Sequence, residues 1–300
     1  MGARLELRHL RYFIAVAETG SLTEAAEQRL YTSQPSLSRQ IRDLESHVGA
    51  QLFSRSVRGV ELTDAGKAFL EHARLALMHV DAAAEMARRA AQPERKTFAI
   101  GFQTGHEMNW LPPAMQLLHH ELQEIEVTVS SGYSPDLADS LARGRLDLAF
   151  LRVEPDFDLE YHVVDREPLI VLMPSDHRLT ARSSVSPQAL VGEIFIAGSN
   201  KAAVLQTVTE DYLRRSGIDI KRDHGVDNMA MAISLVASTR GVALMPEYAK
   251  NLLPPSVVSR PLEGEPPTID IAVGYSKSNT SPVLELFLSR LDELVRHPRH

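Results

Sequence analysis

The stretch that decides the fold of the N-terminal region is Ser33-Gln34-Pro35-Ser36-Leu37-Ser38-Arg39-Gln40-Ile41. At about 100° per residue, Leu37, Ile41 and Leu44 point within about 40° of one direction and form the buried stripe of a helix. The opposite side of this helix carries Pro35, Ser38, Arg39 and Arg42, and Gln34 lies at its exposed start. Short polar groups and arginine near a helix N-terminus are typical of a helix that enters the DNA major groove. An ordinary polar surface helix has the same composition, so this stretch alone leaves both interpretations open.

The residues before this helix predict two further helices. Apolar residues recur at helical spacing over about 7–17, and Gly20 ends this first helix because glycine tolerates the left-handed conformation. The capping box Ser21-Leu22-Thr23-Glu24 starts a short second helix that ends near Arg29. The third helix then covers about 33–47. Two short helices joined by a tight polar turn are typical of a helix-turn-helix.

A short wing is predicted after the third helix. Residues 52–63 alternate apolar and polar side chains around Gly59, which indicates two small strands with Arg55 and Arg58 at or near their tip. Arginine on a wing beside a recognition helix contacts phosphates or the minor groove. The formal net charge of the chain is −7, whereas 29–58 holds five arginines and only two acids. A short basic patch suits local phosphate contact, although a solvated charged face would show the same excess.

These segments together resemble the N-terminal signature of LysR-type transcriptional regulators. The resemblance is carried by Leu7 to Phe13, Gly20 to Ala26, Ser33 to Ile41, Leu44-Glu45, Leu52 to Arg55 and Leu62 to Gly66. It implies a helix-turn-helix at about 22–41, with Gln34, Pro35, Ser38 and Arg39 on the base-reading helix and Arg55 on the wing. The candidate DNA-binding residues are Ser33, Gln34, Pro35, Ser36, Ser38, Arg39, Arg42, Arg55 and Arg58.

A long helix is expected to connect this region to the rest of the chain. Thr63 caps it, and it reaches about Gln92, before Pro93. Its small and apolar residues are spaced alternately four and three apart: Phe69, Ala73, Ala76, Val80, Ala83, Ala87 and Ala90. Alanine is common in any helix, yet such a heptad seam on an otherwise polar helix favours a partner helix. We therefore expect a homodimer that binds a double-stranded DNA operator with dyad symmetry. The resemblance further implies a homotetramer.

After residue 96 the pattern changes to strands alternating with helices, which predicts a mainly parallel α/β sheet. Strands are expected at 97–102, 125–130, 146–151, 169–173, 194–197, 242–245 and 268–275. Helices are expected at 112–121, 135–143, 202–216, 229–238 and 283–296. The segments Ile100 to Phe102, Leu111-Pro112, Gly144 to Ala149 and Gly241 to Pro246 resemble the effector domain of LysR-type regulators. That resemblance implies two α/β lobes, like those of periplasmic solute-binding proteins, with a cleft between them.

The whole chain is thus expected to have three parts. They are a winged helix-turn-helix over 1–62, a linker and dimerisation helix over 63–92, and an effector-binding domain over 97–300. Within that domain, one lobe is expected at about 97–166 and 268–300, and the other at about 167–267.

Ligands of open α/β sheets bind beyond the carboxyl ends of the strands. Hydroxyl and small residues next to helix N-termini occupy four such places, at 103–106, 130–134, 199–201 and 227–228. Free N–H groups at helix N-termini favour an anion, so we expect a small organic or aromatic carboxylate as effector, with Lys201 helping to neutralise it. Ordinary helix caps explain any single one of these residues equally well. The candidate effector-binding residues are Thr104, Gly105, His106, Ser131, Ser134, Ser199, Asn200, Lys201 and Asn228.

The sequence offers no catalytic or cofactor motif. It contains no cysteine, no GxSxG, no P-loop and no dinucleotide glycine fingerprint, and no helical pair of histidines three or four residues apart is accompanied by the expected acidic ligand. No run of about 18 apolar residues and no signal-peptide core is present, so a cytoplasmic protein without cofactor or metal is expected. Two alternatives to a regulator stay open at this point: a solute-binding protein, and an α/β enzyme with an appended DNA-binding module.

Overall fold

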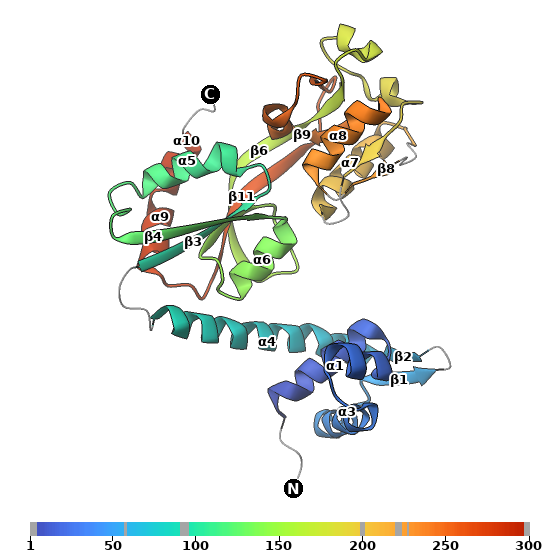
Figure 1. The fold of residues 1–300 in the computed structure, drawn as a ribbon, viewed down its shortest axis with the longest axis vertical. Coiled ribbons are helices and arrows are strands. Elements are labelled where there is room, and N and C mark those ends of the chain that lie inside the picture. Colours follow the sequence, from blue (N-terminus) through green and yellow to red (C-terminus); the bar gives the residue numbers. More distant parts are fainter. Residues whose placement is uncertain are drawn as a thin grey trace. The chain divides into compact units, whose positions relative to one another are not determined.

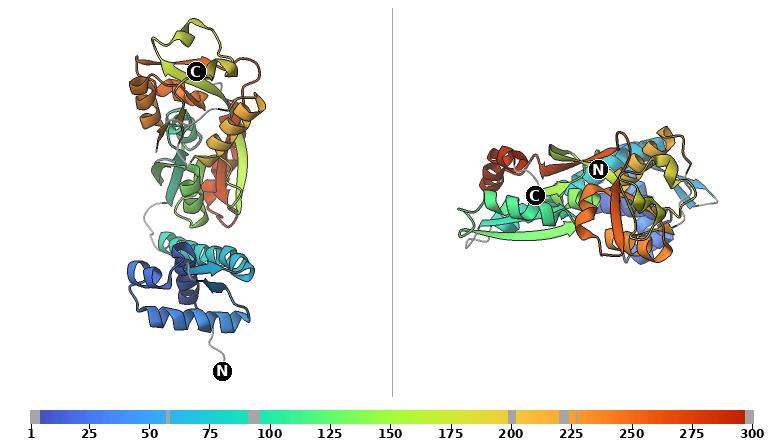
Figure 2. Two further views of the ribbon diagram at one scale, coloured as in Figure 1. Left: turned by 90° about the vertical axis from the view of Figure 1, so that its right-hand side faces the viewer. Right: turned by 90° about the horizontal axis from the view of Figure 1, so that it is seen from above.

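The computed structural model describes residues 5–56, 59–90, 96–198, 202–219, 224–226 and 228–296. The chain divides into two compact units, Met1–Arg88 and Arg89–His300, and each is described by itself. Figures 1 and 2 show the elements of both. Among the described residues, no helix combines the length and the apolar character needed to cross a membrane.

The N-terminal unit is built on three short helical segments. Helix α1 spans Leu7–Thr19 and ends at Gly20, whose φ of 64° is left-handed as expected. Helix α2 (Leu22–Glu24) continues into the π-helical turn η1 (Ala25–Arg29), and helix α3 spans Gln34–Val48. Ser21 and Ser33 cap α2 and α3, because their hydroxyl groups accept hydrogen bonds from the backbone N–H of Glu24 and Ser36. The predicted helix-turn-helix is therefore present.

The predicted wing is a two-stranded antiparallel hairpin of β1 (Phe53–Ser56) and β2 (Gly59–Leu62). Its second strand is held against the end of α1, because the N–H of Val60 donates to the carbonyl of Gly20 at 2.9 Å. Gly59 has a φ of 126°, and a Cβ there would lie 2.8 Å from the same carbonyl oxygen. Glycine is thus required where the hairpin approaches α1.

The long helix α4 spans Asp64–Ala90, and Thr63 caps it by accepting a hydrogen bond from the N–H of Gly66 at 2.9 Å. The first part of its predicted seam packs inside its own unit. Phe69 stands edge-on to Phe13 with ring centroids 5.0 Å apart, and Ala73 and Ala76 join the same core. Ala83 is exposed, as is Ala87. The free part of the seam is therefore shorter than the spacing predicts, and the proposed helix end near Gln92 lies outside the described residues.

In the second unit, the first lobe is a sheet with helices on both faces (Figure 1). The parallel strands β3 (Lys96–Gln103), β4 (Ile125–Gly132) and β5 (Leu148–Leu151) lie next to β11 (Thr268–Ser276). Side chains alternate along β3, so that Phe98, Ile100 and Phe102 pack on one face and Ala99 on the other. The first face is covered by α5 (Glu107–Leu117), α9 (Pro282–Ser289) and α10 (Leu291–Arg296), and the second by α6 (Ser134–Ala142).

The second lobe repeats this alternation on strand β6 (Leu159–Pro174). Leu169, Val171 and Met173 face a core that includes α7 (Ala203–Arg215), whereas Ile170 and Leu172 face α8 (Met229–Thr239). Strands β9 (Ala243–Pro246) and β10 (Val257–Pro261) pair with β6, and β7 (Ile196–Ala197) pairs with β8 (His224–Gly225). Three short 3-10 helical turns complete the described part of this unit: η2 (Arg178–Ala181), η3 (Pro187–Leu190) and η4 (Glu247–Leu252).

Two long strands, β6 and β11, cross between the lobes and pair with each other in antiparallel register. One strand leaves the first lobe and the other returns to it, so they must run in opposite directions. The prediction of a mainly parallel sheet is therefore wrong for the pairs that β6 makes with β9, β10 and β11, and for β11 with β5. The return of residues 268–275 to the first sheet occurs as predicted, while helix α5 begins at Glu107, five residues before the predicted start.

Candidate DNA-binding surface and effector pocket

Helix α3 presents most of the predicted DNA-binding side chains to solvent. Ser33, Pro35, Ser36, Arg39 and Arg42 are exposed, and Gln34 is half-buried. Arg39 makes no hydrogen bond or ion pair with any described residue, so its guanidinium is available to an external acceptor. Guanine O6 and N7 are the acceptors that an arginine in the major groove contacts most often.

Ser38 departs from the prediction, because it is only 8% exposed. It lies one residue after Leu37 and three before Ile41, about 60° from the latter around the helix. It therefore flanks the buried stripe, and its backbone carbonyl accepts a hydrogen bond from Nε of Arg42 at 3.3 Å. The outer face of α3 is narrower than the sequence indicates.

The wing is tied to the recognition helix by a carboxylate. One oxygen of Glu45, on α3, accepts hydrogen bonds from the backbone N–H of Leu52 at 2.8 Å and of Phe53 at 3.1 Å. Two charge-assisted bonds at the start of β1 fix the wing relative to α3. Of the predicted wing residues, Arg58 lies outside the described residues, and Arg55 is described only by its backbone in β1.

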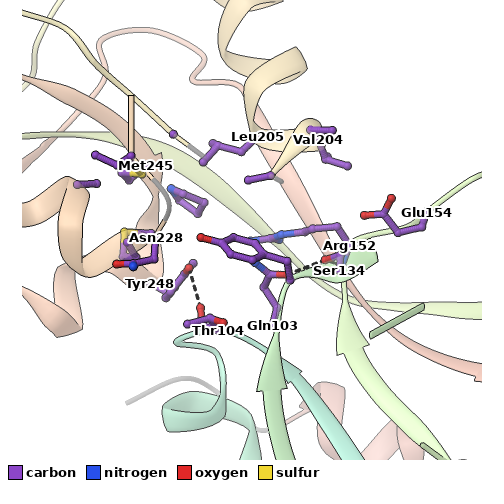
Figure 3. Close-up of a pocket in the computed structure, with 18 residues that line it drawn as sticks. Gln103, Thr104, Ser134, Arg152, Glu154, Val204, Leu205, Asn228, Met245 and Tyr248 are labelled. Carbon is purple, nitrogen blue, oxygen red and sulfur yellow. Dashed lines mark hydrogen bonds between the residues drawn. The ribbon is translucent and has the colours of Figure 1, made fainter. Parts of the chain in front are cut away.

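A pocket lies between the two lobes of the second unit and encloses about 640 Å³, part of it open to solvent (Figure 3). The first lobe supplies polar residues that follow its strands, namely Gln103, Thr104, Ser134, Arg152 and Glu154. The second lobe supplies a mainly apolar wall. That wall contains Val204, Leu205, Val226, Met229, Ala232, Met245 and Pro246. The pocket thus combines an apolar side with a polar side, as small-molecule sites usually do.

Three of the predicted effector residues line this pocket: Thr104, Ser134 and Asn228. Ser131 is exposed and donates to the hydroxyl of Thr104 at 3.3 Å, and the backbone N–H of Gly105 donates to the carboxylate of Glu107 at 2.7 Å. The remaining residues of the predicted set, Ser199, Asn200 and Lys201, lie outside the described residues.

His106 was expected at the pocket surface, but its side chain is fully buried in an ionic network. Its Nε2 lies 3.0 Å from an oxygen of Glu167 and 3.2 Å from the guanidinium of Arg152. Arg152 donates to the same Glu167 oxygen at 2.8 Å and to the carbonyl of Asp270 at 2.7 Å. One arginine therefore links the pocket to both crossover strands, since Glu167 lies on β6 and Asp270 on β11.

The protonation of this network follows from its burial. Burial is the main cause that lowers the pKa of His106, and it outweighs the hydrogen bond and charge of Glu167. Nδ1 of His106 has no hydrogen-bond partner among the described residues, which suits a neutral ring whose Nε2–H donates to Glu167. Burial raises the pKa of Glu167, but His106 and Arg152 together bring it below its usual range. Glu167 is thus ionised and Arg152 is its counter-ion.

The second lobe reaches this network through Tyr248 of η4. Its ring packs on His106 with centroids 3.9 Å apart, and its hydroxyl donates to the carbonyl of Thr104 at 3.0 Å. Burial raises the pKa of this tyrosine far above neutrality, so it stays a hydrogen-bond donor. Arg152, Glu154, Glu167 and Tyr248 were not anticipated. An arginine directly after the apolar strand 148–151 was the available signal for the first of them.

Comparisons with known proteins match both units. The family described as bacterial regulatory helix-turn-helix proteins of the lysR family matches residues 7–67, and the LysR substrate binding domain matches residues 91–296. The Hca operon transcriptional activator HcaR of Escherichia coli (strain K12) is 33% identical over 292 residues, which cover 96% of this chain and 98% of HcaR. The transcriptional regulator AlsR of Bacillus subtilis (strain 168) is 31% identical over 288 residues, covering 95% and 94% of the two chains.

Among solved structures, full-length BenM is 26% identical with a TM-score of 0.56, over 97% of this chain and 96% of BenM. CbnR complexed with its target DNA shares the fold at 23% identity and a TM-score of 0.57, over 97% of this chain and all of CbnR. The two matched domains follow one another in the order that the sequence predicted, and together they span most of the chain. The chain belongs to the LysR family of bacterial helix-turn-helix transcription regulators.

Proposed function

We propose that this LysR-family regulator senses a small organic carboxylate, with an aromatic or other apolar body, in the pocket between its lobes. The observation that carries the proposal is the division of that pocket into an apolar wall and a set of hydrogen-bond donors. Burial of the apolar body against residues such as Leu205 and Met245 supplies most of the binding free energy. The polar side then orients the carboxylate.

The donors suited to an anion come from the ends of β3 and β5. The side-chain oxygen of Gln103 accepts from Ser134 at 2.6 Å, so its amide nitrogen is left to donate toward a ligand. Thr104 adds a hydroxyl group, and Arg152, whose charge is matched by Glu167, also lines the pocket. A relative named as the Hca operon activator and the structural relative BenM are regulators of the same architecture.

The DNA-binding part of the proposal is a dimer that recognises two half-sites. Exposed Ala83 and Ala87 on α4 provide a small-residue strip for close approach of a second helix. Two copies of α3, each with an outward Arg39, would then contact an operator with dyad symmetry.

Two measurements test these claims. Isothermal titration of the full-length protein against organic and aromatic acids should give saturable binding; binding only of neutral or cationic compounds would overturn the carboxylate proposal. A gel shift with the DNA upstream of the protein's own gene, at low salt, should show retardation. No retardation under those conditions contradicts operator binding at that locus.

A further inference from the structure

Of the charged side chains that line the effector pocket, one has no counter-ion within the described part of the chain. Among the described lining residues the charged ones are Arg152 and Glu154. The guanidinium of Arg152 is already matched by Glu167. The carboxylate of Glu154 makes no hydrogen bond or ion pair with any described residue, so it is a free acceptor at the pocket surface.

Glu154 is held in its place by its backbone. The hydroxyl of Tyr161 accepts a hydrogen bond from the N–H of Glu154 at 3.4 Å and donates one to its carbonyl at 3.2 Å. The side chain is partly buried there, and this burial, with a smaller effect of Asp156, raises its pKa. A partly buried carboxylate has lost some of its hydration, so it gains from a hydrogen-bond donor that a ligand brings.

The position of Glu154 separates it from the other polar groups of the pocket. In Figure 3 it lies on the side opposite Asn228 and Tyr248, with Arg152 between them. The amide of Gln103, which is left free to donate, lies with Thr104 at the end of β3. The pocket therefore offers a donor group in one region and a charged acceptor in another.

We propose that the effector carries, besides its carboxylate, a hydrogen-bond donor such as a hydroxyl or amino group that binds Glu154. The carboxylate faces Gln103 and Thr104, and the apolar body lies against the wall of the second lobe. An acid without such a hydroxyl or amino group would place its negative charge in the same pocket as Glu154. The carboxylate of Glu154 would then lose hydration without gaining a hydrogen bond. This inference rests on the proposed function, since it assigns the second polar group of the same ligand.

Matched acids test it by isothermal titration of the full-length protein. The probes are phenylacetate, its 3- and 4-hydroxy derivatives and the two corresponding methyl ethers, which keep the oxygen but lose the donor. A hydrogen bond to a charged group corresponds to about 10- to 150-fold in affinity. At least one hydroxy acid should therefore bind at least about 10-fold more tightly than both its methyl ether and phenylacetate. In Glu154→Ala this preference should fall to within about twofold, whereas in Glu263→Ala, an exposed glutamate outside the pocket, it should persist.

Each other outcome overturns a stated claim. Equal binding of hydroxy acids, ethers and phenylacetate to the wild type overturns the donor inference and leaves the proposed carboxylate effector intact. An equal gain in affinity for every acid in Glu154→Ala would mean that Glu154 only repels the negative charge of the ligand, and it also overturns the donor inference. If the protein binds neither these acids nor any acid of the wider panel, the proposed function itself is overturned.

Discussion

The guanidinium of Arg152 lies 2.8 Å from the carboxylate of Glu167, and the two side chains are 8% and 0% exposed. A buried ion pair adds little to the free energy of unfolding compared with two apolar residues of similar size. Removing one partner, however, leaves the other charge buried without a counter-ion. Because Arg152 also lines the pocket and donates to the backbone of β11, this ion pair links the pocket to the two crossover strands.

Glu167→Ala should lower the free energy of unfolding by about 3–5 kcal/mol, because it leaves Arg152 buried without its counter-ion. Urea denaturation followed by circular dichroism measures the change. Asp139→Ala, which removes a half-exposed partner of Arg143, is the matched control and should cost about 1 kcal/mol or less. If Glu167→Ala lowers the free energy of unfolding by no more than Asp139→Ala does, the buried ion pair is not what stabilises this region.

Acidification should destabilise the second unit through His106. Its pKa is lowered in the folded state, so the unfolded chain binds the proton more readily. The stability that comes from keeping His106 neutral is fully present above the pKa of the unfolded chain, about 6.5. It is lost as the pH falls from there through the lower pKa of the folded state.

Thermal unfolding between pH 7.5 and 5 measures this dependence. Titration of the other histidines is common to wild type and His106→Gln, so the comparison isolates the ring of His106. The wild type should lose more stability over that interval than the variant does. Parallel curves for the two proteins would show that His106 is not held neutral by its surroundings.

Arg39→Ala should weaken operator binding by about 1–3 kcal/mol, if its free guanidinium contacts a base edge as we propose. Fluorescence anisotropy with a labelled operator fragment, at fixed salt, gives the affinity. Arg214→Ala removes the same charge from the exposed face of α7 and should leave the affinity unchanged. If the operator affinity of Arg39→Ala is unchanged, Arg39 does not contribute to operator recognition.

Ala83→Glu should disrupt the dimer, because it places a charge in the interface that the exposed strip of α4 is proposed to form. Sedimentation equilibrium measures the association constant. Ala68→Glu puts the same side chain on an exposed position of α4 outside the seam and should leave association intact. A dimer equally stable in both variants would refute the seam.

Local signals in the sequence were sufficient for the first unit and only partly sufficient for the second. Helix ends at Gly20, Ser33 and Thr63 were predictable because each depends on a single capping residue and its neighbours. The antiparallel pairing of β6 with β11 was not, because it joins segments about a hundred residues apart, and no local pattern sets the direction of a return strand.

The pocket shows the same distinction. Thr104, Ser134 and Asn228 were found because they follow strands or begin helices. Glu167 lies inside a 16-residue strand that also contains Glu160 and Asp165, and nothing in this local pattern marks it as the acid with a buried partner. Its role depends on Arg152 and His106, which reach it from the ends of two other strands.

The bond between Glu45 and the first residues of the wing bears on which operators this protein accepts. With α3 and the hairpin held as one body, the protein fold sets the distance between the base pairs that we expect the helix to contact and the DNA backbone that we expect the wing to contact. Inserting one base pair inside a half-site would shift one contact relative to the other by about 3.4 Å of duplex and rotate it around the helix axis. We therefore expect each half-site of the operator to keep a fixed length.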